Sequence, residues 1–410
     1  MTVTMSNYTV RAAACDHRSD DEAVYQKLRE AVAPLDRSWE RLKQADKIAV
    51  KFNQDFNRSR MFAGQRRELV SDSVARAVLK ILREDTDAEL VCVDASWFRI
   101  HQQTDTRETT QIASILDEFG VRYLDCTAPP FVGCSVPGGG AMFGIYEFAE
   151  ELIEADELVS VAKMKNHGFM GVTGCLKNLF GLVPAEFRPR HYYHHLVRMP
   201  YMLADIGRIL DPALSVVDGM VAQPGGEWRE EACDGVIADT VLAGDHAVAT
   251  DSCMAYLMGH DPEADWLIDP FIRDRNCLEV AREYEFGTNR LKDFDFEHEP
   301  EPASEGTFYC QVDDPIDTII AWRRSMCEQA LYYRDHLEQF LPYRDQFVMI
   351  QRGEVKWHSP DGSIDTSRRL IAGDHVKESL FLKFVDPEQH EDEQYDVYER
   401  ALVDIERRNL

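Results

Sequence analysis

The sequence predicts an α/β protein with one or more mostly parallel sheets, helices on both faces, two lobes around a cleft, and a small β-rich C-terminal appendage. Three observations predict this fold class. Short apolar runs alternate with amphipathic stretches over residues 1–290. The chain has 410 residues, more than the roughly 250–300 at which a single hydrophobic core stops growing. The last quarter of the chain carries a hairpin pattern instead.

The alternation of strands and helices can be followed along the first 290 residues. An opening strand precedes an amphipathic helix from about Asp20, and the apolar run KIAVKFN from Lys47 is typical of a buried strand. The proline- and glycine-rich residues 128–143 are predicted to form a loop. The other predicted strands are Glu89–Asp94, Val121–Asp125, Asp156–Lys163, Leu214–Gly219 and Thr240–Asp245. The other predicted helices are Glu68–Arg83, Thr109–Phe119, Tyr146–Glu154, Leu196–Leu210, Ala247–Met258 and Asp269–Tyr284.

The C-terminal part has a different pattern. Residues 291–315 include the acidic stretch DFDFEHEPEPASEG and are predicted to be a linker or crossover. A long helix over Ile316–Phe340, a hairpin over Gln346–Trp357 and a strand over Ser379–Val385 follow, with Arg352 and Gly353 at the hairpin turn. We therefore expect an α/β core over residues 1–290 and a helix with a small β-hairpin appendage over residues 316–410.

The composition excludes some classes of function. The formal net charge is −28, with 73 acidic and 45 basic residues, so the chain as a whole repels nucleic acid and anionic membranes. Ten cysteines are present and none forms a CxxC pair, which removes the usual spacing of structural zinc and of ferredoxin-like clusters. We see no signal peptide and no apolar stretch of membrane-spanning length, and expect a cytoplasmic protein with free thiols.

The segment from Val159 to Gly181 is predicted to be the centre of the active site. An apolar strand leads into a loop with Lys163, Lys165, Asn166 and His167. Ligands in α/β folds bind at the carboxyl ends of strands, which is where we expect this loop to lie. Glycines at this spacing allow an anionic ligand to approach the backbone closely. The alternative is a tight strand-to-helix connection with ordinary surface side chains. The further candidates for cofactor binding here are Gly171, Thr173, Gly174, Asn178 and Gly181. Lys177 lies directly before Asn178.

The sequence KMKNHGFMGVTGCLKNLFG resembles the signature of the family catalogued as domain of unknown function 362. VVDGM at Val216–Met220 and the stretch Leu242–Pro262 resemble later motifs of that family, so that the likeness covers Lys47–Gly287. Many members carry an appended ferredoxin-like cysteine set. Its absence here disfavours an iron–sulfur redox partner.

The same loop also resembles that of the nickel-pincer lactate racemases, over this one short motif. The resemblance implies that Lys177 holds a cofactor and that His167 is an acid/base. The loop around Lys51, Asn53 and Arg58 lies where that family binds phosphate, although its own pattern is not reproduced. A divalent metal or a nickel-pincer-type nucleotide is accordingly the expected cofactor, with its identity left open.

Other polar residues are candidates for metal or cofactor binding. His191, His194 and His195 have helical spacing suited to one metal ion, the alternative being a polar helix start. Asp245 ends a strand and Asp251 would follow in the next helix, where either could bind a cation; a helix N-cap is the competing role for Asp245. Asp218 also ends a strand and is either a site residue or a turn former.

We expect an enzyme, with a racemase or isomerase or a redox reaction on a small hydroxy- or carboxy-acid. His167 would be the acid/base, Lys177 the cofactor anchor or clamp, and Lys165 an added positive charge. The alternative is a metal- or nucleotide-binding protein without turnover. The expected partners are a small-molecule substrate and, as an open alternative, a second copy of the chain, with no nucleic acid and no membrane.

Overall fold

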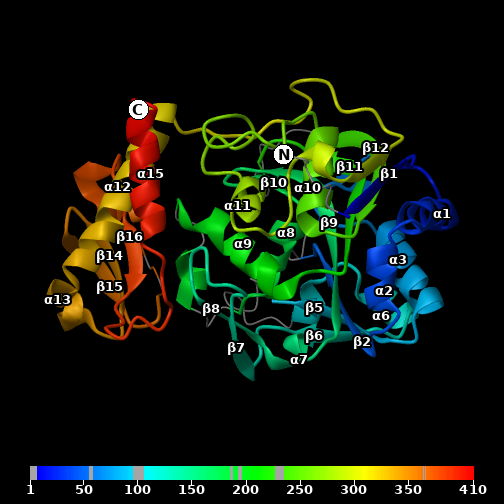
Figure 1. Cartoon of the computed structure of the whole chain (residues 1–410), viewed down its shortest axis with the longest axis horizontal. Helices are drawn as coiled ribbons and strands as arrows, with labels where there is room; N and C mark the ends of the chain where they lie inside the picture. The colour runs from blue at the N-terminus through cyan, green and yellow to red at the C-terminus, as the bar shows by residue number, and fades with distance from the viewer. Residues whose placement is uncertain are drawn as a thin grey trace.

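The computed structural model describes residues 7–54, 59–95, 106–184, 188–192, 196–226, 235–362, 364 and 366–410. It has the predicted α/β fold, with a large, mostly parallel sheet flanked by helices and a small antiparallel sheet near the C-terminus (Figure 1). Within the described residues the large sheet has nine strands, in the order β13-β1-β12-β11-β9-β2-β5-β6, with β10 paired to β9. These strands are β1 (Thr9–Ala14), β2 (Lys47–Phe52), β5 (Glu89–Asp94), β6 (Arg122–Asp125), β9 (Glu157–His167), β10 (Gly171–Thr173), β11 (Leu214–Gln223), β12 (Val236–Gly244) and β13 (Asp295–His298).

Strands β11, β9, β2, β5 and β6 run parallel to one another. From β2 the chain continues to β5 and β6 on one side, then returns to β9 on the other side of β2. Adjacent strands whose connections leave in opposite directions create a crevice at their carboxyl ends, where open α/β sheets bind ligands. The carboxyl ends of β2 and β9 are that position here.

Helices cover both faces of the large sheet. Val159 and Val161 of β9 share a core with α1 and α3, whereas Ala162 and Met164 share one with α8 and α10, as expected from the alternation of side chains along a strand. The helix α3 begins after Ser71, whose hydroxyl accepts a hydrogen bond from the amide of Val74. The helices of this part are α1 (Asp21–Val32), α2 (Asp36–Leu42), α3 (Asp72–Asp85), α5 (Thr106–Thr109), α6 (Ala113–Glu118), α7 (Glu150–Ile153), α8 (Cys175–Asn178), α9 (Arg198–Leu210), α10 (Ala247–Leu257) and α11 (Cys277–Glu283).

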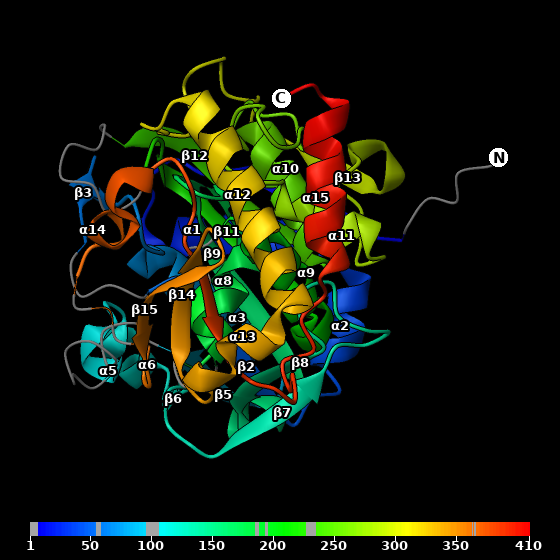
Figure 2. The same cartoon turned by 90° about the vertical axis from the view of Figure 1, so that its left-hand side faces the viewer.

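The C-terminal part forms a second layer at one end of the molecule, where α12 and α15 stand beside the small sheet (Figures 1 and 2). The hairpin with Arg352 and Gly353 at its turn is confirmed, and both residues have positive φ angles, 57° and 76°. The elements are α12 (Ile316–Asp335), α13 (Leu337–Phe340), β14 (Phe347–Gln351), β15 (Glu354–Ser359), α14 (Arg368–Ala372), β16 (Phe381–Phe384) and α15 (Asp396–Arg407).

A buried charge network joins this layer to the main part of the chain. Arg198, the first residue of α9, has no exposed surface, and its Nε donates to Glu393 at 2.8 Å. Its Nη1 donates to the carbonyl oxygen of Leu382 at 2.8 Å. Lys383 Nζ contacts Glu391 at 2.6 Å and Glu393 at 2.7 Å. The counter-charges of a fully buried guanidinium therefore come from residues near the end of the chain.

Several predicted elements were wrong. Residues 128–143 contain β7 (Phe131–Ser135), which pairs with β8 (Ile145–Ala149), so the helix predicted from Tyr146 begins only at Glu150. The proline and glycine residues are compatible with this hairpin, because β7 pairs with a strand on one side only and its other edge needs no hydrogen bonds to a neighbouring strand. The helix predicted over Asp269–Tyr284 shrinks to α11, because Asn276 caps it by accepting from the amide of Leu278.

Two smaller features complete the fold. Part of the segment 291–315 forms β13, which pairs in parallel with β1. A short hairpin of β3 (Met61–Phe62) and β4 (Gln65–Arg66) precedes α3. None of the helices in the described ranges combines the length and the apolar character that crossing a lipid bilayer requires.

Candidate functional site

Two buried ion pairs mark the carboxyl ends of the central strands. Lys51 of β2 contacts Asp94 of β5 at 3.1 Å, with side chains 1% and 5% exposed. Lys163 of β9 contacts Asp218 of β11 at 3.0 Å, with neither side chain exposed. Charged groups are rarely buried at this depth without partners. The polar character predicted for this end of the sheet is therefore present inside the protein.

The Lys163–Asp218 pair also fixes the start of α3. Asp218 Oδ2 accepts a hydrogen bond from the amide of Ser71 at 2.7 Å, and Oδ1 accepts one from the amide of Met220 at 3.2 Å. Burial lowers the pKa of Lys163, and the negative charge of Asp218 opposes that shift. The predicted site residue Asp218 thus has a structural partner on each oxygen.

Asn178 and Gly181 close the ends of β2 and β9 from the other side. Asn178 Nδ2 lies 3.1 Å from the carbonyl oxygen of Lys51, 3.1 Å from Ser160 Oγ and 3.3 Å from the carbonyl oxygen of Val161. A Cβ on Gly181 would lie 2.9 Å from Lys51 Cε. Asn53 follows β2 and is buried, and its Oδ1 has no hydrogen-bond partner among the described residues.

The segment that was predicted to be a loop is a β-hairpin. Strand β9 continues to His167, and β10 returns antiparallel to it, with Gly171 opposite His167 and Thr173 opposite Lys165. Gly171 has a φ angle of +76°, which favours glycine at this tight return. Because alternate residues of a strand share a face, Lys163, Lys165 and His167 lie on one face of β9 and Asn166 on the other.

His167 is held by the backbone of the hairpin turn. Its Nδ1 accepts hydrogen bonds from the amides of Phe169 at 3.0 Å and Met170 at 3.2 Å, and the residue is 8% exposed. Backbone amides can only donate, so Nδ1 must present its lone pair, and the neutral ring carries its proton on Nε2. The ring is therefore a hydrogen-bond donor through Nε2.

A chain of polar groups supports the other face of the hairpin. Asn166 Nδ2 donates to the carbonyl oxygen of Gly171 at 3.0 Å and lies 3.1 Å from His260 Nε2. His260 Nδ1 lies 3.5 Å from Asp269 Oδ2. Burial lowers the pKa of His260, and Asp269 opposes the shift. Sequence reasoning gave His260 no role, although it lies in the motif Leu242–Pro262.

The corner between β10 and α8 is built around Asp251. Its Oδ1 accepts from the amide of Cys175 at 2.7 Å and its Oδ2 from the amide of Leu176 at 2.8 Å. A Cβ on Gly174 would lie 2.3 Å from the Asp251 carboxylate. Burial raises the pKa of Asp251 to about 7, and the two amides oppose this. Asp251 thereby orients the short helix that carries Lys177, a partly buried residue.

The remaining predicted site residues lie elsewhere or outside the described residues. Asp245 does not cap α10; its Oδ1 accepts from the amide of Thr9 at 3.0 Å, and His246 is the cap. The ring of His191 packs at 4.7 Å from that of Phe347 in the small sheet. Arg58, His194 and His195 lie outside the described residues. The three-histidine metal site therefore stays a prediction.

Potential metal donors converge at a different place in the described part of the chain. Ligand atoms of Asp16, His17 and Asp239 all lie within 4.8 Å of one another. His17 Nδ1 is 2.8 Å from Asp239, and Asp16 pairs with Arg18 at 2.7 Å. These contacts already account for the cluster. Around His167 the donor set is unsuited to a metal in the observed state, because Nδ1 accepts two amides and Nε2 carries the proton.

Comparison with known proteins identifies relatives over part of the chain. The family described as "Domain of unknown function (DUF362)" matches residues 48–256, about half of the chain. The "Thylakoid-associated protein sll1697" of Synechocystis sp. is 27% identical over 202 residues, which are 43% of this chain and 62% of that protein. This chain thus spans less than two thirds of that relative. The solved structure of the lactate racemase apoprotein from Thermoanaerobacterium thermosaccharolyticum matches with a TM-score of 0.37 and 13% identity, over 63% of this chain and 58% of that one.

Proposed function

We propose that this chain, which belongs to the family described as domain of unknown function 362, is an enzyme whose active site lies at the β9–β10 hairpin. The reaction would be an isomerisation, such as a racemisation, or a redox reaction on a small hydroxy- or carboxy-acid. The observation that carries the proposal is the fixed orientation of His167. Two backbone amides donate hydrogen bonds to Nδ1 and so fix the ring, whereas a histidine on the surface would be solvated by water.

His167 would act through its Nε2 proton. An imidazole in this tautomer donates a hydrogen bond to an oxygen of the substrate and stabilises negative charge that develops there. Taking up a second proton at Nδ1 would require the ring to give up both amide hydrogen bonds. This refines the acid/base role expected from the sequence: the neutral ring would donate a hydrogen bond through Nε2 and keep that proton.

Lys165 and Lys177 would provide positive charge for an anionic ligand. Lys165 lies on the same face of β9 as His167, and its residue is 2% exposed. Lys177 lies on α8, whose first amides are held by Asp251, so its backbone is fixed independently of a ligand. A role of Lys177 as a cofactor anchor belongs to this proposal.

The test is a search for turnover with a matched pair of variants. Wild type, His167→Gln and His298→Gln are incubated with a panel of enantiopure hydroxy- and carboxy-acids, and products are scored by chiral chromatography and mass spectrometry. His298 is exposed on β13 and serves as the control. We expect His167→Gln to lose about 100-fold or more in rate, within the range for a positioned hydrogen-bond donor, and His298→Gln to match wild type.

Two outcomes would overturn the proposal. Equal turnover by His167→Gln and wild type would remove His167 from the chemistry. Retention of a ligand by wild type without conversion of any compound in the panel would favour a binding protein without turnover.

A further inference from the structure

We propose that Arg273, whose guanidinium lies over the rings of Phe169 and Trp322, is the binding site for a carboxylate group of the ligand that His167 acts on. This inference rests on the proposed function and names the chemical class of its substrate as a carboxylic acid. Arg273 lies in the segment between α10 and α11, and neither the motifs nor the comparisons assign it a role.

The Arg273 guanidinium lies over two aromatic rings. Arg273 Cζ lies 4.2 Å from the ring centroid of Phe169 and 5.5 Å from that of Trp322. Trp322 is itself fixed, because its Nε1 donates to the carbonyl oxygen of Val376 at 2.8 Å. Stacking on the faces leaves the in-plane N–H groups of an arginine available for polar partners.

The in-plane groups of Arg273 are only partly used. Nη1 donates to Asp314 at 2.8 Å. Nε is buried and has no hydrogen-bond partner in the part of the chain that the structure describes. Nε and Nη2 form the edge of a guanidinium that binds a carboxylate through two parallel hydrogen bonds. A buried N–H without a partner is costly, so a ligand carboxylate at this edge would be stabilising.

The neighbouring carboxylates do not fully offset the burial of the Arg273 guanidinium. Burial lowers the pKa of Arg273, and Asp314 and Asp274 oppose this only in part. The carboxylate of Asp274 is occupied elsewhere, by Arg323 and by the amide of Val197 at 2.6 Å. Asp314 remains as the direct counter-ion, on the Nη1 side.

Arg273 adjoins the hairpin turn that holds His167. The amide of Phe169 donates to His167 Nδ1 at 3.0 Å, and the two rings have centroids 6.2 Å apart. Cys310, from a distant part of the sequence, also contacts this turn: its Sγ lies 3.2 Å from the carbonyl oxygen of His167. Phe169 thus adjoins both the guanidinium and the imidazole, which places Arg273 beside the turn that holds His167.

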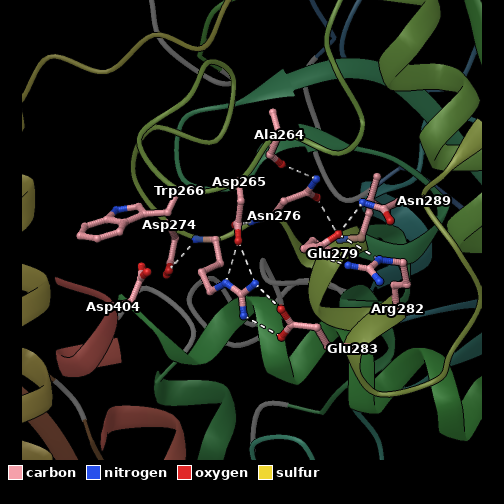
Figure 3. A network of polar contacts seen from close by, with 12 residues as sticks. Ala264, Asp265, Trp266, Asp274, Asn276, Glu279, Arg282, Glu283, Asn289 and Asp404 are labelled. Atoms are coloured by element: carbon pink, nitrogen blue, oxygen red, sulfur yellow. Dashed lines mark hydrogen bonds and ion pairs between the residues drawn. The ribbon is translucent and has the colours of Figure 1, made fainter. Parts of the chain in front are cut away.

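The segment that presents Arg273 is rigidly anchored at the residues that follow it (Figure 3). Arg275 pairs with Asp265 at 2.8 Å and with Glu283 at 2.7 Å. Asn276 Nδ2 donates to the carbonyl oxygens of Pro262 at 2.8 Å and Ala264 at 2.9 Å. An arginine on such a segment loses little conformational entropy when it binds a ligand.

The competing explanation is that Arg273 only locks the hairpin turn to α12. The experiment separates the two by measuring binding directly. Acetate and L-lactate are titrated into the whole chain, with acetamide and L-lactamide as neutral matches, and the Arg273 Nε–H signal is followed by NMR. Arg273→Lys identifies the signal, Arg273→Gln removes the positive charge, and Arg344→Gln on an exposed arginine is the control.

We expect the Arg273 Nε–H signal to shift with the carboxylates and not with the amides. Arg273→Gln should weaken carboxylate binding about tenfold or more, Arg273→Lys should weaken it less, and Arg344→Gln should match wild type. Carboxylate binding by Arg273→Gln at wild-type strength, even with lowered thermal stability, would overturn the inference in favour of the structural lock. So would the absence of any shift.

The result is distinguishable from failure of the proposed function. If Arg273 binds carboxylates but His167→Gln leaves turnover unchanged, the role of His167 is wrong and the carboxylate site stands. If turnover depends on His167 while Arg273→Gln leaves the KM for the acid unchanged, only the carboxylate site is wrong.

Discussion

Lys163 Nζ lies 3.0 Å from Asp218 Oδ2, with both side chains fully buried, and the same oxygen accepts the amide of Ser71. One ion pair therefore connects β9, β11 and the start of α3.

Removing one partner of this pair should destabilise the fold strongly. Lys163→Met leaves the carboxylate of Asp218 buried without its counter-charge, and we expect the free energy of unfolding to fall by about 3–5 kcal/mol. Lys27→Met, which breaks an exposed pair with Glu30, should change it by less than about 1 kcal/mol. Urea denaturation of both variants checks this. Equal small effects would show that the buried pair is not coupled to folding.

Two glycines of the same segment should respond differently to alanine. A Cβ on Gly174 would lie 2.3 Å from the Asp251 carboxylate, whereas one on Gly168 would be 3.6 Å from its nearest neighbour, the carbonyl oxygen of Gln311. We expect Gly174→Ala to lower the free energy of unfolding by about 1–3 kcal/mol and Gly168→Ala by less than about 0.5 kcal/mol. Thermal unfolding with calorimetry measures both. A tolerated Gly174→Ala would mean that the corner at α8 can relax.

Asp251 should make the stability depend on pH. Its pKa is raised from 3.8 to about 7, so the folded protein keeps a proton that the unfolded chain loses. The stability contributed by this proton is fully present at low pH and is lost as pH rises between the unfolded and the folded pKa, by on the order of 1.4 kcal/mol per pH unit. The difference in free energy of unfolding between wild type and Asp251→Asn should therefore change steadily between about pH 4 and about pH 7. Glu406→Gln, at an exposed position, is the control and should give a constant difference.

His246 should make the stability depend on pH in the direction opposite to that of Asp251. Its ring stacks at 4.3 Å on Tyr8, and burial together with the positive charges of Arg37 and Arg41 lowers its pKa from 6.5 to about 3. The unfolded chain takes up a proton between these values and the folded protein does not, so stability is lost as pH falls through the window.

His246→Asn keeps an acceptor at the helix cap and removes the titration. We expect it to be less stable than wild type by about 1–3 kcal/mol near neutral pH, through loss of ring packing, and to approach wild type as the pH falls. Denaturation at several pH values measures the gap. A gap that stays constant would contradict a neutral buried imidazole.

The sequence predicted those elements whose pattern is local. The apolar runs of β2 and β5 and the hairpin turn at Arg352 each follow from a few neighbouring residues. The extension of β9 beyond Lys163 could not be predicted, because Lys165, Asn166 and His167 are polar residues on a strand buried by distant partners. Polar residues after an apolar run are typical of a loop, and here tertiary contacts override that preference.

The remaining features of the candidate site could not be predicted, because they depend on contacts between residues far apart in the sequence. Asn166 and His260 are separated by 94 positions, and Ser71 and Asp218 by 147. Arg273 lies in a segment that was predicted to be a helix, and no sequence pattern indicates that its guanidinium contacts two aromatic rings. Glycine spacing predicted a close approach of a ligand at Gly174 and Gly181, whereas the groups that lie close to them in the structure are Asp251 and Lys51 of the chain itself.

The position of Arg198 has a consequence for biosynthesis. Glu393 and Tyr398, which neutralise and cover its guanidinium, follow this arginine by 195 and 200 positions, so the ribosome adds them much later. Until they emerge, α9 would have to bury an uncompensated cation, which is strongly unfavourable. The large sheet can assemble during translation, but the N-terminal turn of α9 should become native only after Glu393 and Tyr398 have left the ribosome, so a nascent chain stalled before β16 should remain open to proteases at Arg198.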